Sequence, residues 1–97
     1  MNDYSHLMPP DEDPVTQGFR DHWNVFIEAH KIHVERTKVR GDLWRVDGIV
    51  KMAMVAEDKA RRIRYALENG LDPELDDAYD LVNYAAFVAR LIKERDA

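Results

Sequence analysis

The third hydrophobic segment of the chain carries a row of acidic and amide side chains at helical spacing. Asp72, Asp76, Asp80 and Asn83 are three or four residues apart, so a helix would bring them to one side. Neighbouring carboxylates repel by about 0.2–0.5 kcal/mol per pair unless a cation lies between them. Oxygen ligands of this kind suit Mg²⁺ with substrate phosphates. Asp72 is explained as a helix cap, and the alternative for the others is a solvated acidic face.

A dense run of charges, Glu57-Asp58-Lys59-Ala60-Arg61-Arg62, precedes this row. Asp58 and Arg62 are four residues apart and are expected to pair on a helix surface, which needs no ligand. Lys59 lies at the edge of an apolar stripe, from where its ammonium group reaches toward the next helix. There it would neutralise Asp80 or bind a phosphate, and the two roles are compatible.

The next candidate site combines a glycine with basic residues and an aromatic ring. It consists of Lys38, Arg40, Gly41, Asp42 and Trp44. Glycine allows a backbone to approach a ligand closely, and an aromatic ring can stack on a base. The pattern is compatible with a nucleotide site. The alternative for Trp44 is a plug over the end of a helical bundle.

Other kinds of reactive site are not favoured. The chain has no cysteine, which excludes disulfides, thiolate metal sites and cysteine nucleophiles, and its one serine, Ser5, has no catalytic partners in sequence. His30 and His33 have a spacing that metal sites use, but His30 belongs to an apolar stripe and no carboxylate motif accompanies the pair. Packed, hydrogen-bonded histidines are the preferred interpretation.

Three amphipathic helices are expected to position these residues, over about 16–39, 47–69 and 72–93. Gly41 would end the first helix, Asp47 would cap the second, and Pro73 would begin the third. The stripe of the first helix consists of Phe19, Trp23, Phe26, Ile27, His30 and Val34; that of the second of Ile49, Met52, Ala53, Ala56, Ala60, Ile63 and Leu67.

The expected fold is therefore all-α, a three-helix antiparallel bundle over residues 16–97, preceded by a flexible acidic arm with prolines at residues 1–15. The third helix has a wide apolar sector, which Leu81 and Val88 extend. A homodimer would cover that surface, since a chain of 97 residues builds a small core.

The bulk composition narrows the partners. A net charge of −5 disfavours binding to extended nucleic acid, which needs a cationic surface, but allows a single nucleotide. Neither a bilayer-spanning apolar stretch nor a secretory signal is present in the sequence. We expect a cytoplasmic protein with no membrane association.

In their order along the chain, the charged segments resemble the nucleotide-modification-associated domain of phages and prophages. The matching residues are Gly41-Asp42, Glu57-Asp58-Lys59-Ala60-Arg61-Arg62-Ile63, Asp76 and Asp80-Leu81-Val82-Asn83-Tyr84-Ala85, between Phe26 and Ile92. The resemblance implies an all-α fold and a role in phage nucleotide metabolism. More remotely, the chain is similar to MazG-like nucleoside triphosphate pyrophosphohydrolases, which hold Mg²⁺ with acidic residues of two helices.

This remote similarity implies a Mg²⁺ site made of Glu57, Asp58, Asp77 and Asp80. Asp80, Asp58 and Glu57 would be catalytic, because the metal they hold polarises a phosphate. The implied nucleotide-binding residues are Lys59, Arg62, Asn83, Asp76, Trp44, Gly41 and Asp42. The chain departs from the enzymes at Arg61, which stands where they have a third carboxylate, and at Asp77, which replaces a glutamate.

Three functions follow as hypotheses. The first is a Mg²⁺-dependent enzyme that splits a nucleoside triphosphate into a monophosphate and pyrophosphate. The second is a module that binds a nucleotide or deoxynucleotide without turnover, which Arg61 favours. The third is a helical protein-interaction module whose acidic tail and negative charge suit a basic partner.

Overall fold

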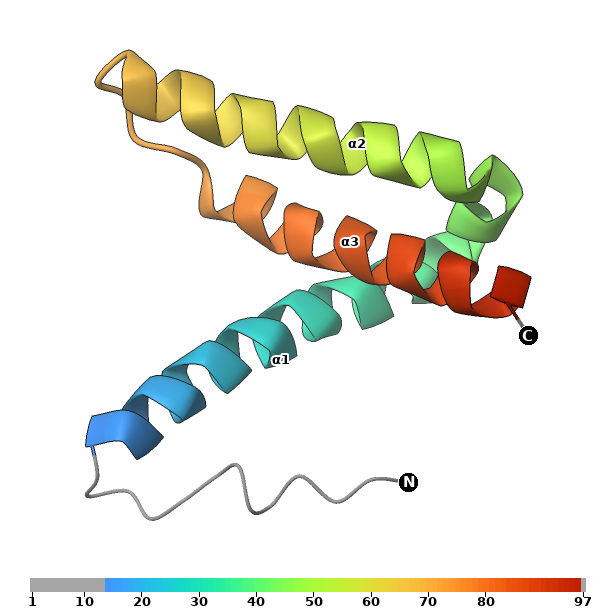
Figure 1. The fold of residues 1–97 in the computed structure, drawn as a ribbon, viewed down its shortest axis with the longest axis horizontal. Coiled ribbons are helices and arrows are strands. Elements are labelled where there is room, and N and C mark those ends of the chain that lie inside the picture. Colours follow the sequence, from blue (N-terminus) through green and yellow to red (C-terminus); the bar gives the residue numbers. More distant parts are fainter. Residues whose placement is uncertain (1–13, 97) are drawn as a thin grey trace.

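The computed structural model describes residues 14–96, and side chains from residue 17 onward, as a bundle of three α-helices (Figure 1). They are α1 (Pro14–Arg40), α2 (Leu43–Glu68) and α3 (Leu75–Asp96). α3 runs antiparallel to α2 along most of its length and crosses α1, so it is the helix that holds the other two together. The expected all-α bundle is confirmed. The expected arm lies largely outside the described residues, but Pro14 and Val15 belong to α1.

Two glycines end helices where the sequence indicated it. Gly41 follows α1 with a φ of 65°, and its N–H donates to the Thr37 carbonyl at 2.8 Å. Gly70 follows α2 with a φ of 68°, and the next N–H, of Leu71, donates to the Ala66 carbonyl at 2.8 Å. Both are left-handed residues that close a helix, a conformation that glycine adopts without steric cost.

The start of α3 differs from the expected one. Asp72 and Pro73 belong to the connection between α2 and α3, and the helix begins at Leu75. Asp72 was expected as the cap and Pro73 as the first helical residue, but Glu74, whose carbonyl accepts from the Asp77 N–H at 3.1 Å, directly precedes the first turn. The first turn of α3 contains Asp76 and Asp77 and its last turn contains basic residues, so these charges complement the helix dipole.

α2 contains a kink that the sequence did not predict. It begins at Leu43 with a short helical turn, and Gly48 (φ 83°, ψ 173°) separates that turn from the long helix that follows. The long part thus begins close to Asp47, as expected. The kink places Trp44 across the end of the bundle rather than along the α2 axis.

We expect Gly48→Ala to lower the free energy of unfolding by about 1–3 kcal/mol, because non-glycine residues pay that cost in this backbone region. No atom lies within 4 Å of a Cβ built at Gly48, so backbone strain alone causes the loss. Urea unfolding followed by circular dichroism measures it. Gly18→Ala, inside α1 and equally open, is the control and should be neutral or stabilising. Equal effects of the two changes would contradict the strain at Gly48.

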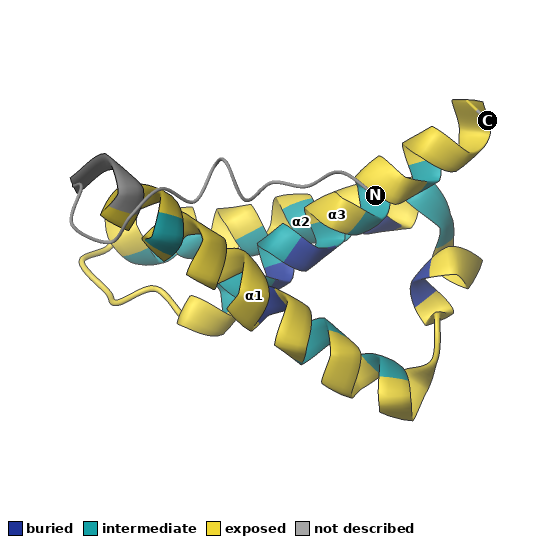
Figure 2. Ribbon diagram, turned by 90° about the horizontal axis from the view of Figure 1, so that it is seen from below, coloured by how far each residue is buried: buried dark blue, intermediate teal, exposed yellow. Residues whose placement is uncertain are grey.

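The fully buried core of the described residues is small. Ala29, Trp44 and Met52 are its apolar members, and Asp80 and Asn83 are its polar ones (Figure 2). The stripe expected to bury α1 is instead largely solvent-exposed. Its exposed members are Phe19, Trp23, Phe26, Ile27, His30 and Val34. α3 covers α1 only around Ala29 and beyond, which leaves the first half of α1 uncovered.

Candidate functional site

The charged centre of the molecule is Asp80, which is 7% exposed although it is ionisable. Arg36 of α1 donates from Nη1 to Asp80 Oδ1 at 2.5 Å, and Lys59 Nζ of α2 lies 3.0 Å from Asp80 Oδ2. One carboxylate on α3 therefore joins all three helices. A buried carboxylate is tolerated only when cations and hydrogen bonds replace the water it loses, which these two side chains do.

These contacts move the pKa values of the two buried partners in opposite directions. Burial by itself would raise the pKa of Asp80, but the hydrogen bonds and positive charges of Arg36 and Lys59 outweigh it and hold the pKa below its ordinary value. The hydrogen bond to Asp80 raises the pKa of Lys59 against the opposing effect of burial. Both groups are charged at neutral pH.

Lys59 also approaches Asp77, with 3.4 Å between Nζ and Oδ1. The expected pairing of Lys59 with Asp80 is thus confirmed, and Asp77 joins it. Asp76 was expected beside Asp80 but is exposed, because it lies about 100° further around the helix from its neighbour Asp77.

The expected surface pair of Asp58 with Arg62 does not form. Arg62 Nη1 lies 3.6 Å from Asp77 Oδ1, because the side chain turns toward α3. Glu57 pairs instead with Arg61 at 2.6 Å, one helical turn further along α2.

The implied magnesium ligands are not gathered in one place. Glu57 and Asp58 are exposed on α2, whereas Asp77 and Asp80 face the Lys59 ammonium. Within residues 17–96, no three acidic or histidine side chains form a group that could hold a metal ion. Lys59 supplies the positive charge between Asp77 and Asp80 that a metal would otherwise supply, so these residues do not fit Mg²⁺ in this arrangement.

Asn83 has the partner that a buried amide requires. Its Nδ2 donates to the Ala29 carbonyl of α1 at 2.8 Å, and its side chain is buried. This bond satisfies the amide, which would otherwise be a buried polar group without a partner. Together with Asp80, one turn earlier, it fixes how α3 crosses α1.

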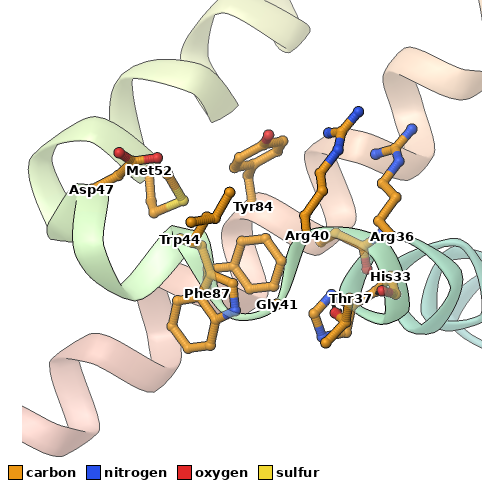
Figure 3. A pocket seen from close by; sticks show the side chains of 12 residues that line it. His33, Arg36, Thr37, Arg40, Gly41, Trp44, Asp47, Met52, Tyr84 and Phe87 are labelled. Carbon is orange, nitrogen blue, oxygen red and sulfur yellow. Dashed lines mark hydrogen bonds between the residues drawn. The ribbon is translucent and has the colours of Figure 1, made fainter.

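A cavity of about 190 Å³ opens beside this crossing (Figure 3). It lies where the end of α1, the first turn of α2 and the middle of α3 meet. Its lining residues are His33, Arg36, Thr37, Arg40, Gly41, Leu43, Trp44, Asp47, Met52, Asn83, Tyr84 and Phe87. Gly41, Trp44 and Asn83 of the expected nucleotide-binding residues line it, whereas Asp42 pairs with Arg45 next to it (3.7 Å).

Aromatic rings form one wall of the cavity. Trp44 stacks on Phe87 with ring centroids 4.7 Å apart, and Tyr84 meets Phe87 edge to face at 5.5 Å. The guanidinium groups of Arg45 and Arg90 each lie 4.6 Å from the Trp44 ring centroid. Trp44 therefore closes the end of the bundle, and other side chains already cover the faces of its ring. A base would have to stack on another ring.

The indole nitrogen of Trp44 is the one buried side-chain polar atom in the described residues that has no hydrogen-bond partner. Figure 3 shows it on the side of the ring toward Gly41, which also lines the cavity. A buried donor without an acceptor costs roughly 1–3 kcal/mol. An acceptor brought into this corner by a ligand would recover part of that cost after a small local adjustment.

Cations mark the opposite side of the cavity. Arg36 and Arg40 are one helical turn apart on α1, and in Figure 3 both side chains extend in the same direction. The Arg40 guanidinium has no ion-pair or hydrogen-bond partner within the described part of the chain, and it is exposed. Asp47 is the acidic residue of the lining and lies at the far end, beside Met52.

His33 lies between these cations and the aromatic wall. Its ring meets Phe87 at 5.0 Å, and its Nδ1 is 3.4 Å from the Thr37 hydroxyl. Burial lowers the pKa of His33, and the charges of His30 and Arg90 lower it further. The ring is therefore a neutral wall of the cavity at pH 7. The expected packing is found for His33, whereas His30 is exposed.

Sequence reasoning missed Arg36, His33, Tyr84 and Phe87 as members of this site. Tyr84 belongs to the segment Asp80–Ala85 that resembles the phage domain, but that resemblance does not predict that Tyr84 lies beside α1. Arg36 is one of several basic residues near the end of α1, and only the crossing of α1 and α3 distinguishes it.

Compared with known protein families, curated proteins and solved structures, the chain matches none. The resemblance to the phage domain therefore stays a prediction. No helix within residues 14–96 is both long and apolar enough to cross a membrane.

Proposed function

We propose that the cavity between α1, α2 and α3 binds a nucleotide and holds it without turnover. The observation that carries the proposal is an arginine pair, with the unpartnered guanidinium of Arg40, at the rim of an aromatic-walled cavity in an acidic protein. A ligand that suits both features has a planar ring and an anionic group on opposite sides. Nucleotides have this chemistry.

The arginine pair suits a phosphate. Arg36 uses Nη1 for Asp80, and a guanidinium has five N–H donors in all, so others remain for an anion. Arg40 contributes a complete guanidinium, which forms two parallel hydrogen bonds to phosphate oxygens. In a chain of net charge −5, this local positive pair is what would attract an anion.

The aromatic wall suits a base or sugar. A volume of 190 Å³ lies below the ~300–1,000 Å³ of typical small-molecule pockets, so the cavity suits a ring and not a whole nucleotide. The half-buried Tyr84 would line the ring together with Met52 and Asp47, while the phosphates extend over Arg36 and Arg40 into solvent. A partly exposed ligand of this kind binds with moderate affinity.

Capture without turnover fits the charges better than hydrolysis. The pyrophosphohydrolase hypothesis needs carboxylates around Mg²⁺, whereas Asp77 and Asp80 are neutralised by Lys59, and Asp80 also by Arg36. These acidic residues serve the packing of the helices, and the proposed binding site uses the cations.

A thermal-shift screen tests the proposal with nucleoside mono-, di- and triphosphates, in EDTA and in Mg²⁺. A ligand that binds only the folded chain raises the melting temperature. We expect a shift that EDTA does not remove, and larger than the shifts with inorganic phosphate or with the nucleoside alone. No shift at millimolar nucleotide would overturn the proposal. A shift that requires Mg²⁺ and releases pyrophosphate would support the enzyme instead.

Arg40→Gln locates the binding site. Removing one charge-assisted phosphate contact costs about 1.5–3 kcal/mol, so titration calorimetry should show affinity reduced roughly 10- to 100-fold. The fold should be unaffected, since the Arg40 side chain has no partner among residues 17–96. The matched control is Lys38→Gln, a surface cation of the same helix that pairs with Glu35 and does not line the cavity. Equal affinity of both variants would place the ligand elsewhere.

A further inference from the structure

The first half of α1 presents an aromatic face that neither α2 nor α3 covers. This α1 face consists of Phe19, Trp23, Phe26 and Ile27, and Val34 continues it toward the crossing with α3. The three aromatic side chains are 42–50% exposed. The contacts that join α1 to α3 begin at Ala29, so the face lies beyond them, and Figure 2 shows most of α1 exposed.

The α1 face reaches the size of the largest apolar patch on a typical monomer. At ~150–250 Å² per aromatic side chain, nearly half of it exposed, the three rings leave roughly 300 Å² of apolar surface before Ile27 and Val34 are added. That alone equals the lower end for the largest apolar patch of a typical monomer, ~300–600 Å². A stable interface takes ~800 Å² per partner, so the face would supply more than a third of one.

We infer that a second copy of this chain covers the α1 face, and that the two α1 helices pack antiparallel. The described chain buries only Ala29, Trp44 and Met52 as apolar core, which is little for a domain to fold on alone. Its radius of gyration of 15.8 Å also exceeds the ~13 Å of a compact domain of this size. If this chain needs a partner to complete its core, that partner must be present whenever the chain folds. A second copy of the same chain meets this condition.

The charges along α1 select the antiparallel arrangement. Its first half carries one acidic residue, Asp21, and one basic residue, Arg20, so it has no net charge. The second half is basic, with Lys31, Arg36, Lys38 and Arg40 against Glu28 and Glu35. A parallel pair places the two basic halves side by side, whereas an antiparallel pair places each basic half beside a half without net charge. The homodimer contact, which the sequence predicted on the third helix, is thus assigned to α1.

Sedimentation equilibrium of the full chain, without nucleotide, tests the dimer. We expect twice the monomer mass of 11.3 kDa at micromolar concentration. Trp23→Lys should weaken association at least 100-fold, while Leu67→Lys, an exposed apolar position on α2, should leave it unchanged. A helical wild-type chain that stays at 11.3 kDa would overturn the inference. Nucleotide binding is measured separately, so either proposal can fail alone.

Spin labels test the direction of packing without destabilising the face. The chain has no cysteine, so Lys38→Cys or Asn24→Cys each gives a single labelling site. With a two-fold axis near Trp23, an antiparallel pair places the two Lys38 labels roughly 45 Å apart at 1.5 Å per residue, and the two Asn24 labels close together. Short distances at both sites would indicate a parallel pair and overturn the antiparallel arrangement.

Discussion

Trp44→Ala is expected to lower the free energy of unfolding by about 3–5 kcal/mol, a large part of what a domain of this size has. Trp44 is 6% exposed and is the largest side chain in the core. Its ring stacks on Phe87 of α3 and carries the guanidinium groups of Arg45 and Arg90. Because the core has few other apolar members, the cavity left by alanine has little to collapse onto.

The measurement is urea denaturation followed by circular dichroism, at one fixed protein concentration. Trp44→Phe is the informative second variant, since it keeps a ring on Phe87 and deletes the unpartnered indole N–H. We expect it to cost much less than alanine. Tyr65→Ala, at an exposed position of α2, controls for loss of an aromatic residue and should stay within about 0.5 kcal/mol of wild type. A Trp44→Ala loss below 1 kcal/mol would mean that the bundle end does not depend on this plug.

Local signals in the sequence predicted the elements of the fold. Apolar periodicity gave the three helices, and Gly41 ended the first of them because glycine tolerates the left-handed turn. The pairing of Lys59 with Asp80 was also predicted, since a cation at the edge of an apolar stripe has to be neutralised where it is buried, whereas the Ala29 carbonyl that accepts from Asn83 was not.

Features that depend on how helices cross were not predictable. Asp76 and Asp77 differ by one residue, and only the position of α2 decides that Asp77 is the one facing Lys59. Arg36 finds Asp80 across 44 residues of sequence, and nothing local separates it from Lys38 or Arg40. The apolar stripe of α1 predicted a buried face, whereas the structure leaves that face exposed, because periodicity does not say whether another part of the chain reaches it.

Asp80→Asn is expected to lower the free energy of unfolding by about 2–3 kcal/mol at pH 7. Removing one member of a fully buried ion pair costs ~3–5 kcal/mol, and the value is smaller here because the Arg36 side chain is 42% exposed and partly solvated. The substitution leaves Arg36 and Lys59 as like charges around a neutral amide. Asp76→Asn is the matched control on the same helix, exposed and without an ion pair among the described residues, and it should cost no more than about 1 kcal/mol, the contribution of its charge to the helix dipole.

The pH dependence separates the charge of Asp80 from its shape. The folded pKa of Asp80 lies below the ordinary value of 3.8, so the unfolded chain binds its proton first as pH falls. The stability that the Asp80 charge contributes is fully present above the pKa of the unfolded chain. It disappears as pH falls through the pKa of the folded chain. The gap in stability between wild type and Asp80→Asn should therefore be constant from pH 5 to 8 and shrink below pH 4. Lys59 acts in the opposite sense: its pKa is raised above 10.5, so its contribution to stability is lost only as pH rises beyond that value.

Chemical denaturation of wild type and Asp80→Asn across the acid range measures the gap in stability between them. A gap that stays constant down to pH 2 would mean that Asp80 acts through packing and not through its charge.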